Sequence, residues 1–119
     1  MYSRYNHCMA NIRKAVSTKY TKKETYKPKN TREKLLIKAL VLLKTEDEVA
    51  ALLRDMLTPA EIEEFANRIT IVKLLTEGLS YIEIAKEVET STTTVTRVAH
   101  WLYNGCGGYQ SILKKISQG

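Results

Sequence analysis

The sequence predicts an all-α fold, and three observations support this prediction. From Thr31 onward, apolar residues recur with the 3.6-residue period of a helix. The pattern Ser/Thr-x-x-Glu, which marks helix starts, precedes several of these apolar runs. No segment alternates apolar and polar residues as a half-buried strand does. At 119 residues and 44% hydrophobic content, the chain suits one small globular domain, which we expect over residues 31–119.

Two leucine-rich helices come first. The helix predicted over residues 32–43 has a broad apolar face. Residues 45–48, Thr-Glu-Asp-Glu, form a capping box that opens a second helix over residues 46–57. The apolar faces of the two helices are too broad for one short chain to cover, so we expect this region to self-associate.

A longer helix is predicted after residue 58, and a short helix is predicted near residue 110. Residues 58–61, Thr-Pro-Ala-Glu, form another capping box with proline at the first helical position, where its missing N–H costs nothing. Gly78 is expected to end this helix in a left-handed conformation. Residues 109–116 are expected to add the last short helix.

The segment from about residue 80 to 103 has the pattern of a helix-turn-helix. Its first helix begins after Ser80, which forms a third capping box with Glu83, and its second begins after Ser91. The turn falls at Glu89, where left-handed backbone usually calls for glycine and another residue costs about 1 kcal/mol. Apolar residues at the expected spacing form the two inner faces: Ile84, Ala85, Val88, Val95 and Val98.

The outer face of the second helix has the chemistry of a nucleic-acid contact. Threonine is a poor helix former, but its hydroxyl can pair with base edges or phosphate and its methyl can touch a thymine methyl. The helix N-terminus itself favours phosphate. A polar face exposed only to water is the alternative. The candidate DNA-binding residues are Ser91, Thr92, Thr93, Thr94, Thr96, Arg97 and His100 on this helix, and Lys86 on the helix before it.

Positive charge gathers at the N-terminus. Residues 1–31 hold eight Lys/Arg and one Glu, a charge of +7, so the total of +6 leaves −1 for the rest. We expect residues 1–30 to form a basic, flexible arm that suits a polyanion such as nucleic acid. A solvated extension without a partner is the alternative, and the two are compatible because basic arms often order only on phosphate.

Other function classes find little support. The chain has no apolar run long enough to cross a membrane and no secretory signal, so we expect a cytoplasmic protein. It has no Gly-rich phosphate loop, nucleophile triad or paired apolar carboxylates, so we expect no enzyme. Cys8 and Cys106 lack metal-binding spacing, and zinc would have to recruit His7 and His100 from distant segments. We therefore expect two free thiols and no metal.

The chain from about Thr31 to Tyr109 resembles the Trp repressor superfamily, and more closely its YerC/YecD-like branch. Three stretches carry the resemblance: MLTPAEIEEFANR at 56–68, IVKLLTEG at 71–78 and SYIEIAKEVETSTTTVTR at 80–97. The closing WLYNGCGGY at 101–109 is typical of the YerC/YecD-like branch and not of Trp repressor itself.

The resemblance implies an intertwined homodimer whose N-terminal helices interlock and whose two helix-turn-helix motifs face successive major grooves. It implies a transcriptional regulator, in most cases a repressor, that binds double-stranded DNA. Its base-contacting positions match Thr92, Thr93, Thr94 and Thr96. An RNA-binding or protein-interaction dimer that keeps the fold is the alternative.

The resemblance also bears on effectors. In corepressor-dependent members two arginines clamp an amino-acid ligand, and Arg68 and Arg97 match them. The residue after the second arginine is glycine in those members, but here it is Val98, and Trp101 stands one turn further along. We expect these side chains to occupy the space of an indole, so tryptophan is not expected as a corepressor. An ion pair between Arg68 and Glu64, and a phosphate contact by Arg97, are the alternatives.

Overall fold

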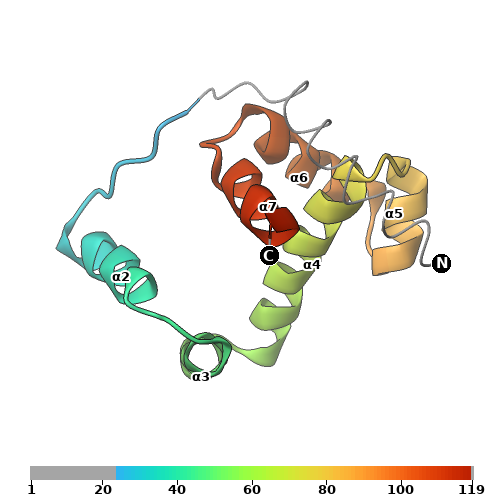
Figure 1. Cartoon of the computed structure of the whole chain (residues 1–119). Helices are drawn as coiled ribbons and strands as arrows, with labels where there is room; N and C mark the ends of the chain where they lie inside the picture. The colour runs from blue at the N-terminus through green and yellow to red at the C-terminus, as the bar shows by residue number, and fades with distance from the viewer. Residues whose placement is uncertain (1–23, 119) are drawn as a thin grey trace. The chain divides into compact units, whose positions relative to one another are not determined.

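The computed structural model describes residues 24–118, and this part of the chain is helical with no strand (Figure 1). The predicted all-α class is confirmed. Most of the predicted arm lies outside the described residues. Within them, no helix is both long and apolar enough to cross a membrane. The helices are α2 (Thr31–Val41), α3 (Glu46–Met56), α4 (Pro59–Thr76), α5 (Tyr81–Val88), α6 (Thr92–Asn104) and α7 (Gly108–Gln118).

The predicted capping boxes all form. In each, a hydroxyl oxygen accepts the backbone N–H of the glutamate three residues on, and that carboxylate accepts the backbone N–H of the hydroxyl residue. Donor–acceptor distances lie between 2.8 and 3.3 Å. Because these bonds stay within one helical turn, the sequence alone predicts them. The pairs are Thr45 with Glu48, Thr58 with Glu61, and Ser80 with Glu83.

One further cap was not foreseen in the sequence. Asn30 caps α2 through its Oδ1, which accepts the N–H of Glu33 at 2.9 Å. The Glu33 carboxylate in turn accepts hydrogen bonds from the Tyr26 hydroxyl, the Lys29 backbone N–H and Asn30 Nδ2. The Tyr26 and Lys29 bonds hold the pKa of Glu33 below its usual range. This cluster fixes residues 26–30 in front of α2, and its signal was the spacing Asn-x-x-Glu.

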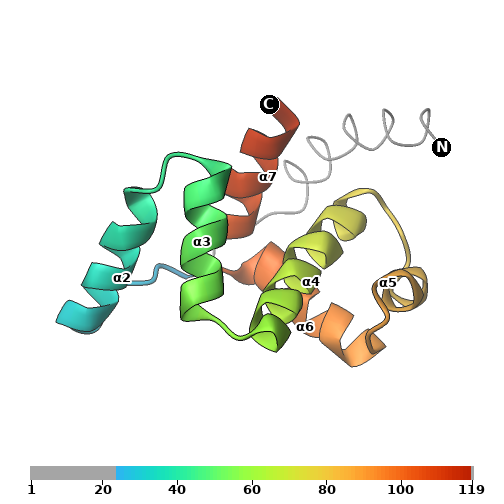
Figure 2. The same ribbon diagram turned by 90° about the horizontal axis from the view of Figure 1, so that it is seen from below.

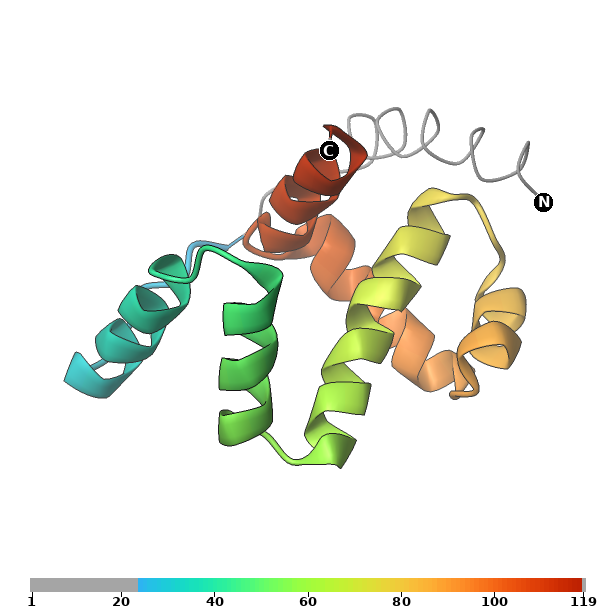
Figure 3. The ribbon, with the colours of Figure 1, turned by 60° about the horizontal axis from the view of Figure 1, so that its bottom comes forward.

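The structure divides into two compact units, and residues 26–66 form the first. This unit holds α2, α3 and the first turns of α4, which follow α3 directly in the chain (Figure 3). Neither α2 nor α3 contains a single buried residue. Leu35 is 66% exposed and Val41 is 75% exposed. The predicted leucine-rich faces are therefore present and uncovered, although α2 ends at Val41, two residues earlier than expected.

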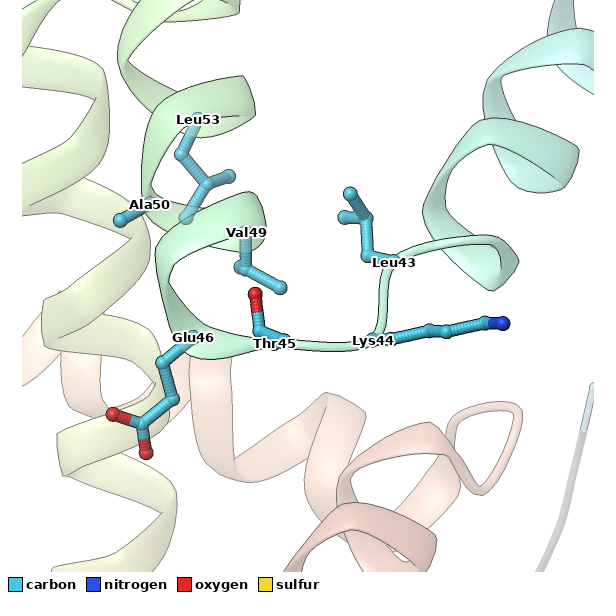
Figure 4. Close-up of a pocket in the computed structure, with 7 residues that line it drawn as sticks. All are labelled: Leu43, Lys44, Thr45, Glu46, Val49, Ala50 and Leu53. Carbon is cyan, nitrogen blue, oxygen red and sulfur yellow. The ribbon is translucent and has the colours of Figure 1, made fainter.

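An open pocket lies where the loop after α2 meets the start of α3 (Figure 4). The side chains of Leu43, Val49 and Leu53 border the same opening, whereas the Lys44 side chain extends away from it. Thr45, Glu46 and Ala50 complete its lining. The uncovered apolar surface of this unit thus includes a depression that an apolar side chain can enter.

The second unit comprises residues 67–118 and contains the core. In Figure 3, α6 passes behind the α4 ribbon, with α5 at its first end and α7 at its last. Gly78 ends α4 with a φ of +88°, as expected, and the N–H of Leu79 bonds the carbonyl of Leu74 at 3.3 Å. The core residues are Ile71, Val72, Leu74, Leu75, Ile84, Ala85, Val95, Val98, Ala99, Leu102 and Leu113.

The last helix is tied to the helix-turn-helix by an amide. Gln110 is buried in the first turns of α7, and its Nε2 donates to the backbone carbonyl of Leu102 at 3.1 Å. The neighbouring Leu113 is also buried. Together these contacts hold α7 on the C-terminal half of α6, which Figure 2 shows from a second side.

The turn between α5 and α6 adopts the strained conformation that its sequence implied. Glu89 has φ 58° and ψ 50°, and it is the only non-glycine residue with a positive φ among residues 24–118. The N–H of the following Thr90 bonds the Ala85 carbonyl at 2.9 Å, so the turn is closed by backbone contacts rather than by the Glu89 side chain. A β-carbon at this position is a source of strain.

Glu89→Gly is therefore expected to stabilise the protein. Removing the β-carbon relieves about 1 kcal/mol of conformational strain at the left-handed residue. For a domain of this size, that gain corresponds to a rise in Tm of roughly 4–8 °C. Glu87→Gly is the matched control, because Glu87 is an exposed residue within α5 and the same change there costs about 1 kcal/mol. Urea unfolding of the two variants measures both effects. Equal destabilisation by both would show that the Glu89 turn carries no strain.

Candidate nucleic-acid interface

The two sides of α6 differ sharply in exposure. Val95, Val98, Ala99 and Leu102 are buried and pack in the core with Ile84 and Ala85 of α5. This is the inner face that the helix-turn-helix spacing predicts. The predicted DNA-binding residues on α6 are exposed, with the exception of the half-buried Thr94: they are Ser91, Thr92, Thr93, Thr96, Arg97 and His100.

Two of these residues build the N-terminus of α6. Ser91 Oγ accepts the backbone N–H of Thr94 at 3.1 Å and lies 3.0 Å from Thr94 Oγ1. The predicted cap at Ser91 is thus present. The same contacts give Ser91 and Thr94 a structural task that does not depend on a ligand, because they satisfy an N–H that the helix leaves without an internal partner.

The remaining hydroxyls of the face differ from one another. Thr96 Oγ1 donates to the backbone carbonyl of Thr92 at 2.9 Å, one turn earlier in α6. The Thr93 hydroxyl makes no hydrogen bond with any described residue. Sequence reasoning did not separate these threonines, because a helical threonine can bond either its own backbone or an outside partner.

The charge of the face suits a polyanion. No Asp or Glu occurs in α6, while Arg97 is exposed on it and Lys86 is exposed on α5, which packs against it. The first-turn N–H groups of α6 add the partial positive charge of a helix N-terminus. Glu83, Glu87 and Glu89 lie on α5 and in the turn and offset part of this charge.

Trp101 does not lie where the sequence suggested. Its side chain is 45% exposed, so the indole does not complete the core of the single chain. Leu102 takes the position one turn after Val98 instead, being 1% exposed, and Trp101 falls at the margin of the buried face. The indole stands edge-on to His100 at a centroid distance of 5.4 Å. Val98, at 5% exposure, does face the core.

The candidate clamp arginines and the described candidate metal ligands lie on the surface. Arg68 and Arg97 are both exposed, and Arg68 lies near Tyr109, whose pKa is raised by burial and lowered in part by this arginine. Cys106 is an exposed free thiol. His7 and Cys8 lie outside the described residues, and within residues 24–118 no group of three possible metal ligands comes together.

Comparison with known proteins places this geometry in a family. The sequence profile of the Trp repressor protein matches residues 32–117, which span α2 to α7 and therefore both compact units. The chain belongs to the Trp repressor family. Within the family it is a Trp repressor-like protein of the YerC branch. The family consists of DNA-binding regulators.

Two relatives support this placement of the Trp repressor-like chain. The uncharacterized protein YerC of Bacillus subtilis (strain 168) is 30% identical over 83 residues, covering 70% of this chain and 80% of YerC. The crystal structure of a TrpR like protein from Eubacterium eligens ATCC 27750 matches with a TM-score of 0.70 and 31% identity. That match covers 74% of this chain and 91% of the other.

Proposed function

We propose that this Trp repressor-like protein is a sequence-specific regulator, a repressor, that binds double-stranded DNA as a homodimer. The observation that carries the proposal is the two-sided α6: a buried inner face fixes the helix on α5, and a polar outer face without acidic residues is left open. The major groove of B-form DNA admits an α-helix. Arg97 and Lys86 are exposed, and we propose that their cationic groups contact phosphates.

The homodimer is inferred from the exposed apolar surface of the first unit, residues 26–66. The exposed leucine faces of α2 and α3 and the open pocket beside Val49 are more apolar surface than a monomeric protein normally leaves in water. A second copy offers the same surfaces in return, which satisfies the self-complementarity that a two-fold dimer requires. Dimerisation also supplies two copies of α6 for two half-sites of one DNA site.

Selection from a randomised duplex pool tests the proposal. We expect the full-length protein to enrich a pseudo-palindromic sequence and Thr93→Ala to flatten its preference by roughly 1–3 kcal/mol per lost base contact. Thr31→Ala, another exposed threonine in the first turn of a helix but outside the helix-turn-helix, is the matched control and should leave the preference unchanged.

An RNA-binding or protein-interaction dimer is the second candidate, favoured by the near-neutral charge of residues 32–119. Competition of the selected duplex against structured RNA of equal length distinguishes the two. Displacement by RNA at equal concentration, or no enriched duplex at all, would contradict the DNA-binding proposal.

L-Tryptophan is not expected to act as corepressor of this protein. Val98 fills the core next to Arg97, where tryptophan-binding members of the family have glycine, so an indole cannot lie close against the backbone. Isothermal titration should show no saturable binding tighter than about 1 mM, roughly −4 kcal/mol. Saturable binding below that concentration, together with tighter DNA binding, would contradict this prediction. Another small anion between Arg68 and Arg97 remains compatible with it.

A further inference from the structure

Two threonines on the outer face of α6 present different groups to a partner. Thr93 and Thr96 are three residues apart on the helix and both are exposed. The Thr96 hydroxyl donates its hydrogen to the Thr92 carbonyl at 2.9 Å, whereas the Thr93 hydroxyl has no partner among the described residues. The donor of Thr93 is therefore available to a ligand, and the donor of Thr96 is already used.

The occupied donor leaves two groups that Thr96 can offer without cost, its γ-methyl and the hydroxyl oxygen, which still accepts a hydrogen bond. In the major groove that oxygen would pair with the amino group of adenine or cytosine, and the Thr96→Val variant below distinguishes such a contact from a methyl contact. Turning the hydroxyl outward would break a formed hydrogen bond, and the gain from a new one would largely be offset by that loss. Contact through the methyl breaks nothing. Arg97, the next residue and also exposed, already provides a charged donor for phosphate, so phosphate binding does not require the Thr96 hydroxyl.

We propose that Thr96 is a specificity-determining residue that selects thymine by packing its γ-methyl against the 5-methyl of the base, while Thr93 contacts the same site through its hydroxyl. Thymine is the one base that carries a methyl group in the major groove, so an apolar contact there separates it from cytosine. This inference rests on the proposed DNA-binding function and adds the chemical identity of one base contact.

Paired substitutions at both positions, measured on the duplex selected above, test the inference. Thr96→Val keeps a methyl and removes the hydroxyl, so its affinity should stay within about twofold of the unsubstituted protein. Thr96→Ser keeps the hydroxyl and removes the methyl, and it should bind about fourfold more weakly for each half-site, the value of one buried methyl group. At Thr93 the order should reverse, with Ser tolerated and Val weaker.

Modified DNA locates the contact. Uracil differs from thymine only in lacking the 5-methyl, so replacing one thymine per half-site by uracil should weaken the unsubstituted protein about fourfold for each half-site. The same replacement should not weaken Thr96→Ser further, because the methyl pair is already broken. Circular dichroism of each variant verifies that α6 is intact.

The outcomes separate the two proposals. If a duplex is enriched but Thr96→Ser binds as well as the unsubstituted protein, or Thr96→Val binds more weakly than Thr96→Ser, the methyl contact is wrong and the DNA-binding function stands. Uracil losses that add to the Thr96→Ser loss at every thymine also overturn it. If no duplex is enriched, the proposed function and this inference both fail.

Discussion

Leu36→Glu combined with Leu40→Glu is expected to convert the proposed homodimer into a monomer and to abolish tight DNA binding. Both leucines are 44% exposed on α2, four residues apart on one face. Burying a fully exposed leucine contributes about 1.5–3 kcal/mol, so burying the exposed 44% of four such side chains in a two-fold dimer contributes about 3–5 kcal/mol. The loss of this contribution corresponds to about 10²- to 10⁴-fold in dimer dissociation.

Lys34→Glu with Lys38→Glu is the matched control for this double variant. These lysines are exposed on the opposite side of α2, at the same spacing, and their substitution changes the net charge twice as much. The molecular mass measured by light scattering, divided by the chain mass of 13.6 kDa, gives the oligomeric state. An unsubstituted protein that is monomeric at micromolar concentration and fully helical would contradict the dimer. A control variant that dissociates equally would show that charge, not apolar burial, holds the assembly.

Deleting residues 1–25 is expected to weaken binding to every duplex by the same factor and to reduce the dependence of affinity on salt. The deletion removes six Lys/Arg from each chain. If half of them reach phosphate in each arm of a dimer, the slope of log K against log salt falls by about five, and affinity falls on the order of a thousandfold. Specificity between sequences should not change, because phosphate contacts carry no base information.

The structure determines where this cut belongs. Tyr26 donates to Glu33, and Lys29 and Asn30 complete the cap of α2, so a deletion that ends at Thr25 leaves the start of the helix intact. Lys114→Gln with Lys115→Gln removes exposed cations from α7 and serves as the charge control. A salt slope that does not change after the deletion would show that the arm makes no phosphate contact.

The parts of this fold that depend on neighbours three or four residues apart could be predicted from the sequence. The capping boxes, the Gly78 helix end and the left-handed Glu89 all belong to this class, since each follows from one turn of chain. The inner face of the helix-turn-helix follows from the same periodicity. The family resemblance reached further, and the matching profile over residues 32–117 confirms it.

Features that depend on a choice between competing contacts could not be predicted. Trp101 falls at the margin of the buried face of α6, where spacing alone does not decide between core and surface. The hydroxyls of Thr94 and Thr96 can bond inward or outward at similar free energy, and only the structure shows that both bond inward. The exposure of the candidate site was predictable, whereas the division of tasks among its side chains was not.

The Ser91–Thr94 cap has a consequence for how target preference can diverge among related proteins. Substitutions at these two positions alter helix stability along with any DNA contact, so they are constrained twice. Thr93 and Arg97 are exposed, and neither makes a side-chain hydrogen bond or ion pair with another described residue. The phosphate contact proposed for Arg97 carries no base information. New target sequences are thus most accessible through changes at Thr93, and a library built to retarget this protein should vary that position while retaining Ser91 and Thr94.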